Sequence, residues 1–226
     1  MKLAILLVLE DIDSKRVRHG MVPSSTHISD VGKIKGSIVN KEKYEKFILQ
    51  ISNEIKRDPK NEVLWNNKGV SLVRLGKCKE AIKCYDKALK FNPEYENAWF
   101  NKGKALTKIS KHRRAIKCYE KALEINPHNV SAWNNLGISQ RSIGKYKEAI
   151  KCFEETIKIH SSYEWGWHNK GYTLYEMGRY EEALKCYDKA LEINPDYISA
   201  QKHRANCIRA MELKADKPRK EGNTKE

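Results

Sequence analysis

A period of 34 residues dominates this chain and constrains its fold more than any other feature. Proline recurs at this spacing at Pro59, Pro93, Pro127 and Pro195, with Ser161 at the intervening position. Five further columns keep the same register: Trp65, Trp99, Trp133 and Trp167; Gly69, Gly103, Gly137 and Gly171; Ala81, Ala115, Ala149 and Ala183; Tyr85, Tyr119, Phe153 and Tyr187; and Ala88, Ala122, Thr156 and Ala190. Self-similarity at such a period is typical of repeat architectures.

Each unit is predicted to contain two helices. Apolar residues recur at helical spacing over residues 62–75, and Gly76 follows them, as glycine often does just past a helix end. A second helix is predicted over residues 79–91, ending before Pro93 because proline disfavours helical geometry in the residue ahead of it. Two short helices cannot bury their own apolar faces, so neighbouring units must stack on one another.

Small residues in both helices predict close packing within the stack. A glycine inside a helix costs about 1 kcal/mol relative to alanine, so the recurrence of Gly69 and its equivalents requires a compensating close approach. Ala81 and Ala88 lie on one face of the second helix and allow a neighbouring helix to come near. Trp65 and Tyr85 are expected to fill the space between the helices.

These columns resemble the tetratricopeptide repeat, in which tryptophan, leucine-glycine, tyrosine, alanine, phenylalanine, alanine and proline recur in that order. The resemblance covers about residues 62–197, or four repeats. It implies an all-α fold, a right-handed superhelical solenoid of antiparallel pairs of helix A and helix B. The chain departs from the family pattern at Lys68, Lys102 and Lys170, where leucine usually precedes the glycine, and at Ser161.

The register of the repeat divides the chain into segments. They are an N-terminal extension at 1–40, a half-repeat or capping helix at 41–61, repeats one to four at 62–95, 96–129, 130–163 and 164–197, a C-terminal capping helix at 198–213 and a disordered charged tail at 214–226. Gln201 stands in the tryptophan column of the C-terminal cap. The apolar run from Leu3 to Leu9 is short for the apolar region of a signal peptide. We expect instead a short strand or helix packed on the array, or a poorly ordered extension. Met21 is an alternative first residue of the protein.

Composition indicates a soluble chain with reduced thiols. No run approaches the roughly 18 to 20 apolar residues that a membrane-spanning helix requires. Six cysteines in a chain without a clear secretory signal favour a cytoplasmic compartment. The formal net charge is +15, so nucleic acid, anionic lipid and an acidic protein segment are all candidate partners.

The sequence contains no motif for catalysis or metal binding. Its seven histidines form no metal-ligand spacing, and it has no phosphate-binding loop or nucleophile elbow. Four cysteines share the column ahead of the helix B aromatic residue: Cys84, Cys118, Cys152 and Cys186. Equivalent positions on stacked helices should lie roughly 10 Å apart, too far for a disulfide or a shared zinc ion. We therefore expect packing cysteines and a protein that is not an enzyme and carries no cofactor.

A column of asparagines in helix A is the candidate binding site. In tetratricopeptide arrays the A helices line the concave face, and by this resemblance one asparagine of each repeat faces the groove: Asn67, Asn101, Asn135 and Asn169. Because a side-chain amide both donates and accepts, the column resembles the asparagine ladder with which some family members hold a peptide backbone. The alternative is that these asparagines cap or bridge neighbouring helices, since short polar side chains readily make local bonds.

Further helix A residues are candidates for setting specificity. They grade from basic to aromatic along the array: Lys104, Lys108, Arg141, His168, Tyr172 and Tyr175. Repeat two has 8 positive and 3 negative residues, a net +5, whereas repeat four has 4 and 7, a net −3, so an acidic segment is expected at repeat two. Steps of roughly 10 Å per repeat match three residues of polyproline II at about 3.1 Å each. This match predicts an extended ligand of about ten residues, read at every third position.

The sequence thus predicts a non-catalytic protein–protein interaction scaffold or adaptor that binds an extended segment of a protein partner. The alternative is a basic nucleic-acid (RNA) binding module. The net charge and the cluster from Lys111 to Lys117 favour this alternative. The spread of basic residues over the chain and the assignment of the tryptophans to the core oppose it.

Overall fold

The computed structural model describes the backbone of residues 28–216 and the side chains of residues 41–214. The apolar run from Leu3 to Leu9, the alternative start at Met21 and most of the charged tail lie outside the described residues. The chain divides into two units, residues 1–43 and 44–226. The described part of the first unit, residues 28–43, is entirely helical.

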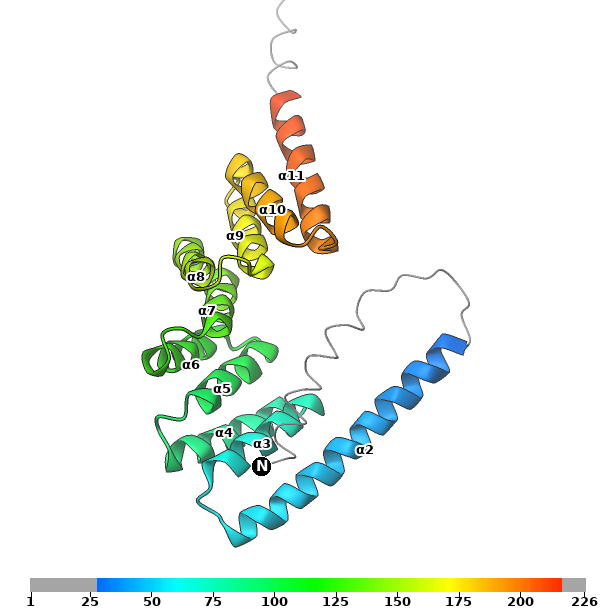
Figure 1. Ribbon diagram of the computed structural model, residues 1–226, viewed down its shortest axis with the longest axis vertical. Coiled ribbons are helices and arrows are strands. Elements are labelled where there is room, and N and C mark those ends of the chain that lie inside the picture. Colours follow the sequence, from blue (N-terminus) through cyan, green and yellow to red (C-terminus); the bar gives the residue numbers. More distant parts are fainter. Residues whose placement is uncertain (1–27, 217–226) are drawn as a thin grey trace, which may run out of the picture. The chain divides into compact units, whose positions relative to one another are not determined.

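The described residues form helices joined by short turns, without a strand (Figure 1). The helices are α2 (Ile28–Arg57), α3 (Glu62–Arg74), α4 (Cys78–Phe91), α5 (Glu96–Lys108), α6 (His112–Ile125), α7 (Val130–Ser142), α8 (Tyr146–Ile159), α9 (Glu164–Glu176), α10 (Tyr180–Ile193) and α11 (Ile198–Asp216). None of the helices in these ranges is long and apolar enough to cross a bilayer. The predicted all-α fold class is confirmed.

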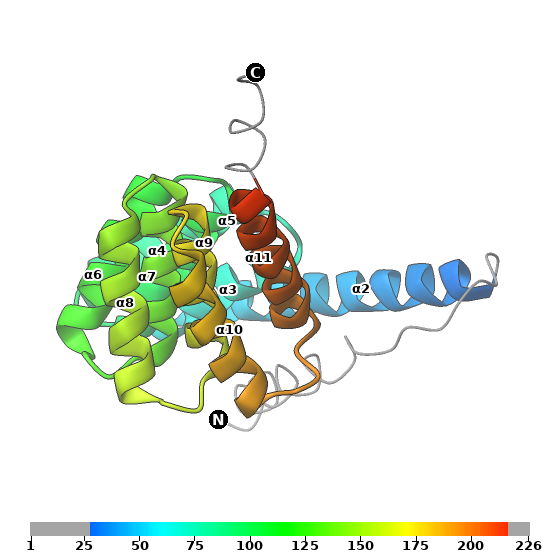
Figure 2. The ribbon, with the colours of Figure 1, turned by 90° about the horizontal axis from the view of Figure 1, so that it is seen from above.

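The second unit is a stack of helix pairs in chain order (Figures 1 and 2). The A helices are α3, α5, α7 and α9, and the B helices are α4, α6, α8 and α10. Each A helix contacts the next A helix, and α9 contacts α11, whereas among the described helices no B helix contacts the next B helix. Because the A helices approach one another more closely, the stack curves toward them. We call the surface of the A helices and α11 on that side the inner face.

The glycine column marks the predicted close approach, and the approaching group is the helix B ring of the same repeat. A Cβ atom on Gly103 would lie 2.6 Å from the Tyr119 ring, and one on Gly69 would lie 2.5 Å from the Tyr85 ring. Both tyrosines are fully buried. Glycine therefore lets an aromatic ring seat directly on the backbone of helix A.

The tryptophan and proline columns are joined by a hydrogen bond. Each indole Nε1 donates to the backbone carbonyl six residues earlier, at 2.7 Å for Trp99 to Pro93 and 3.0 Å for Trp167 to Ser161. Ser161 can replace proline because the acceptor belongs to the backbone. Gln201 makes the same bond through Nε2 to the carbonyl of Pro195, at 2.7 Å, which explains how it replaces tryptophan in α11.

Lysine replaces the usual leucine where it can bridge two repeats. Lys102 Nζ lies 2.6 Å from Asp86 Oδ1, and Lys170 Nζ lies 2.8 Å from Glu154 Oε1, in each case on the preceding B helix. Lys68 Nζ donates to Ser52 Oγ of α2 at 2.9 Å. These departures from the family pattern are therefore contacts between repeats.

The two ends of the stack are single helices. Ile51 and Ile55 of α2 are buried, and Ile48 packs against the core of repeat one. This helix begins at Ile28, whereas the sequence predicts a start near residue 41. Residues 28–40 lack the apolar periodicity on which that prediction rests, so the sequence does not indicate a helix there. At the other end α11 packs on α10 and continues to Asp216.

Candidate peptide-binding face

The helical register groups the predicted site residues on one side of their helices. Residues three, four and seven positions apart share one side of a helix. On α5 this side carries Asn101, Lys104 and Lys108, and on α9 it carries Asn169 and Tyr172. The candidate residues therefore form rows that cross the stack from repeat to repeat.

Two of the four column asparagines bridge successive repeats. Asn101 Nδ2 donates to Asn66 Oδ1 at 3.1 Å, and Asn169 Nδ2 donates to Asn134 Oδ1 at 2.9 Å. In each pair the partner lies 35 residues earlier and is only 5% exposed. The bridging role that sequence reasoning left open is thus present at two positions.

The other two asparagines make only local bonds. Asn135 Nδ2 donates to the backbone carbonyl of Ser131 at 2.7 Å, because Phe100 stands 35 residues earlier and offers no acceptor. Asn67 accepts a long bond of 3.4 Å from Asn66. Both side chains are half-buried, whereas Asn169 is 7% exposed. The four members of the column are therefore not equivalent.

His168 belongs to the same bridging arrangement. Its Nε2 lies 2.8 Å from Nδ1 of His203, which is 34 residues after Asn169 and so occupies the asparagine column in α11. Burial, followed by the charges of His203 and Arg141, lowers the pKa of His168 to about 4. Burial also lowers the pKa of His203. This junction therefore holds two neutral imidazoles, whereas the junction of repeats one and two and that of repeats three and four each hold a pair of amides.

Arg141 and Tyr172 meet where repeats three and four join. The Arg141 guanidinium carbon lies 4.6 Å from the centre of the Tyr172 ring, and its Nε lies 3.7 Å from Glu176 Oε2. Burial lowers the pKa of Arg141, although the Glu176 carboxylate opposes this effect. Tyr175 packs against Tyr180, with ring centres 5.4 Å apart. Part of the predicted aromatic end is thus engaged in packing between helices.

Lys104 and Lys108 supply exposed cations to repeat two. The Lys104 ammonium lies 5.3 Å from the centre of the Phe100 ring, on the same helix. The side of α5 that carries Asn101 is thus basic.

Sequence reasoning missed Trp165. Its side chain is 49% exposed, and its ring centre lies 5.4 Å from that of Tyr197. It stands four residues before Asn169 and seven before Tyr172, on the same side of α9. The sequence does contain an indication of its exposure. This fifth tryptophan falls outside the column of tryptophans that recurs every 34 residues, so the repeat does not require it in the core.

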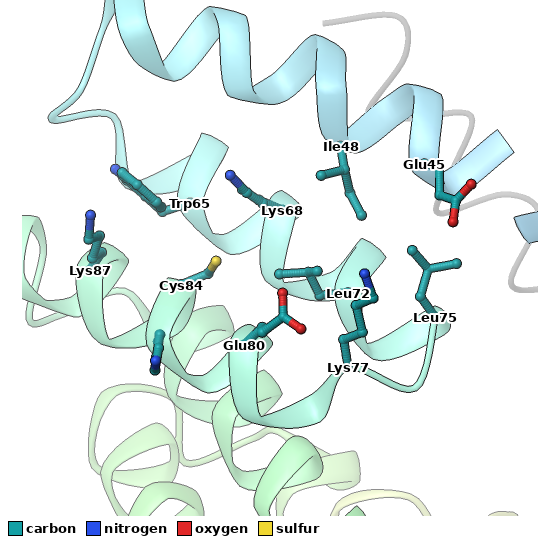
Figure 3. Close-up of a pocket in the computed structure, with 11 residues that line it drawn as sticks. Glu45, Ile48, Trp65, Lys68, Leu72, Leu75, Lys77, Glu80, Cys84 and Lys87 are labelled. Carbon is teal, nitrogen blue, oxygen red and sulfur yellow. The ribbon is translucent and has the colours of Figure 1, made fainter. Parts of the chain in front are cut away.

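A hollow of about 490 Å³ lies between the end of α2 and repeat one (Figure 3). Ile48 of α2, Lys68 and Leu72 of α3, and Cys84 of α4 are among its lining residues. Burial raises the pKa of the Cys84 thiol, so the sulfur stays protonated and is a poor nucleophile. The hollow is therefore lined by several lysines and by a thiol of low reactivity.

The cysteines are buried free thiols, as expected of packing residues. Burial raises the pKa of Cys152 to about 12 and that of Cys186 to about 11, so both remain protonated at neutral pH. Among the described side chains no group of three or more histidine, cysteine, aspartate or glutamate residues is arranged to hold a metal ion.

Two family models match adjoining stretches of the chain. The model described as the tetratricopeptide repeat matches residues 165–197. The model described as the cytochrome c-type biogenesis protein H TPR domain matches residues 31–164, more than half of the 226 residues. No curated protein sequence matches the chain at a significant level.

Several solved structures share the arrangement of helices. The crystal structure of MamA is 24% identical, with a TM-score of 0.65 over 76% of this chain and 97% of MamA. TTC0263, a thermophilic TPR protein of Thermus thermophilus, is 16% identical, with a TM-score of 0.59 over 78% of this chain and 96% of its own. The Cut9-Hcn1 structure of the APC/C is 16% identical, with a TM-score of 0.65 over 75% of this chain and 34% of the matched chain. These likenesses establish the fold, a solenoid of helix pairs.

Proposed function

Because the chain belongs to the tetratricopeptide repeat family, we propose that it is a non-catalytic interaction scaffold that holds an extended segment of a partner protein against its inner face. Contact between successive A helices supports a continuous binding surface. The proposed segment is about ten residues long, because a polyproline II chain advances about 9 Å in three residues, close to the step between repeats.

Trp165 is the observation that carries this proposal. A tryptophan that is 49% exposed leaves a large apolar surface in water. Tryptophan is enriched among the few residues that contribute most of the binding energy at protein interfaces. Its position on the same side of α9 as Tyr172 makes it a natural anchor for an apolar side chain of the ligand.

The asparagine column is proposed to contribute unequally. Asn67 and Asn135 make only local bonds and are the best placed to meet a peptide backbone. Asn101 uses one N–H on Asn66, and its carbonyl oxygen and second N–H can still meet a ligand. Asn169 is assigned a structural role, because it is 7% exposed and bonded to Asn134.

The charge of the inner face suggests the polarity of the ligand. Lys108 is exposed on α5, and repeat two carries a net +5, so the acidic part of the segment is proposed to lie there. The apolar part would then lie over Trp165, two repeats further along. The remaining candidates for contact are Lys104, Arg141, His168, Tyr172 and Tyr175, of which His168 acts through its bond to His203.

The test is a peptide selected on the purified protein from a displayed library of about ten-residue sequences. Trp165→Ala should weaken the binding of this peptide by at least about tenfold, as truncation of an interface anchor does. Fluorescence anisotropy with the labelled peptide measures the effect. Leu213→Ala is the matched control, because Leu213 is 63% exposed but lies near the end of α11. Equal affinity in the wild type and the Trp165 variant would refute the proposed anchor.

The proposal includes a cytoplasmic location. Six cysteines that all remain free thiols are compatible with a reducing compartment.

A further inference from the structure

A second surface of repeat two carries concentrated positive charge on α6 and the turn before it. We define the outer basic patch as Lys111, Arg113, Arg114, Lys117 and Lys121, all of which are exposed. The intervening residues Ala115, Ile116, Cys118 and Tyr119 are buried against the core. Side chains three or four residues apart on a helix lie about 5–6 Å from one another, so the patch is a compact ridge of cations.

Acidic residues neutralise little of this charge. Lys121 pairs with Glu124 at 2.5 Å, and the neighbouring Lys102 pairs with Asp86 at 2.6 Å. Within the described part of the chain, the other four members of the patch form no ion pair. The ridge therefore presents several cations that an external anion can neutralise.

Two hollows adjoin the patch and share Arg114. One, of about 300 Å³, is lined by residues 110–114 and by Ile143 of the next repeat. The other, of about 490 Å³, lies between α5 and α6, and its charged lining consists of Lys102, Arg114, Lys117 and Lys121 together with Glu120 and Glu124. A flexible anionic chain can therefore lie along the ridge with parts of it seated in recesses.

The first turn of α6 differs from that of the other B helices. It contains no acidic residue, whereas α4, α8 and α10 carry Glu80, Glu148 and Glu181 with Glu182. The start of a helix has a partial positive charge that acidic side chains usually offset. Arg113 and Arg114 add to that charge instead, which raises the positive potential of the patch.

We propose that the outer basic patch binds the phosphate backbone of nucleic acid, a function separate from peptide binding on the inner face. Phosphate contacts from Lys and Arg give affinity without any sequence motif. A nucleic-acid strand carries a phosphate at every nucleotide, about one per 3.4 Å of helix axis, so anions are available all along a ridge whose cations lie about 5–6 Å apart. An extended peptide offers a comparable row only if acidic residues occupy every same-side position, about 6.6 Å apart.

A membrane surface fits this patch less well. Proteins that lie on membranes usually insert apolar side chains beside their cations. Among the described residues, the large apolar side chains that stay exposed lie outside repeat two: Leu49, Val63, Phe91, Trp165, Ile198 and Leu213.

The first turn of α10 in repeat four carries acidic residues where the first turn of α6 in repeat two carries arginines, so the fold tolerates either charge at these positions. Glu181 and Glu182 lie 68 residues, or two repeats, after Arg113 and Arg114 and occupy the same first-turn positions. The double variant R113E/R114E therefore copies a natural first turn of the array. The opposite variant E181R/E182R gives repeat four a basic first turn and serves as a gain-of-binding control.

The measurement is the anisotropy of a fluorescent oligouridine of about 20 nucleotides, titrated with the full chain at several salt concentrations. We expect R113E/R114E to weaken binding at least about tenfold at low salt. The slope of log affinity against log salt should fall by about 1.4, since each lost phosphate contact of a single strand contributes about 0.7. E181R/E182R should strengthen binding, and both variants should keep wild-type helicity.

Three outcomes would overturn the proposal. One is equal oligouridine affinity in R113E/R114E and the wild type. Another is competition by polyglutamate, at equal charge, as effective as competition by unlabelled oligouridine, which would indicate an acidic protein segment. The third is binding to vesicles of anionic lipid without binding to oligouridine, which would indicate a membrane. The library-selected peptide should bind R113E/R114E normally, which separates this test from that of the inner face.

Discussion

At the scale of single residues, the role of each column asparagine depends on its neighbour in the preceding repeat. Asn169 donates a hydrogen bond to the side chain of Asn134 and so links two repeats. The corresponding residue for Asn135 is Phe100, which has no side-chain acceptor, and Asn135 bonds to the backbone of its own helix instead. A column of one residue type therefore does not imply a row of equivalent side chains, because the partner lies 35 residues away in a second column.

This difference predicts unequal costs of substitution. Asn169→Ala removes a partner from Asn134, which is 5% exposed, and should reduce the free energy of unfolding by about 1–3 kcal/mol. Asn135→Ala removes only a bond within its own helix and should cost less than about 1 kcal/mol. Urea unfolding followed by circular dichroism measures both values. Equal costs would contradict the assignment of separate roles.

The His168–His203 pair predicts a dependence of stability on pH. The pKa of His168 is about 4 in the folded protein, against an ordinary value of 6.5. As pH falls below about 6.5, the unfolded chain takes up a proton that the folded chain refuses, so stability decreases until about pH 4 and then levels off. A difference of this size corresponds to about 3 kcal/mol. Urea unfolding at a series of pH values tests this decrease.

The control for this effect reproduces an earlier junction of the same array. The double variant His168→Asn/His203→Asn copies the Asn134–Asn169 pair, which does not titrate. Its unfolding free energy should lose less between pH 6.5 and pH 4 than that of the wild type. If the two proteins lose the same amount, the pH effect must arise from other groups.

At the scale of helices, the turn between helix A and helix B requires a left-handed residue. Gly76, Gly144 and Gly178 adopt φ values of 76°, 78° and 74°, and Ser110 adopts 58° at the same place in repeat two. The glycines could be predicted from the repeat, because glycine is the residue that takes this conformation without a steric cost. Ser110 adopts the same conformation at a steric cost, because its Cβ atom crowds the backbone there.

The turn of repeat two is therefore a site for stabilisation. Ser110→Gly should raise the free energy of unfolding by about 0.5–1 kcal/mol, because relief of the left-handed strain exceeds the added backbone entropy. Thermal and urea unfolding measure the change. Lys151→Gly is the control, since Lys151 is exposed in the interior of α8, where glycine should destabilise the helix. Loss of stability in the Ser110 variant would show that this strain is negligible.

At the scale of the whole molecule, the sequence was sufficient to predict the architecture, since a 34-residue period with its proline and glycine signals defines pairs of stacked helices. It was less informative about the candidate site. The exposure of Trp165 and the bond between Asn101 and Asn66 depend on how one repeat lies against the next. The start of α2 at Ile28 could not be predicted either, because residues 28–40 show no apolar periodicity.

The most direct test of the central claim is site-specific photocrosslinking with the selected peptide bound. A photoreactive residue at Ser131, which is exposed at the start of α7 and four residues before Asn135, should crosslink to the peptide in high yield. The same residue at Lys151, which is exposed on α8, should not. Crosslinks from Lys151 with none from Ser131 would place the ligand on the outer surface and contradict recognition by the inner face.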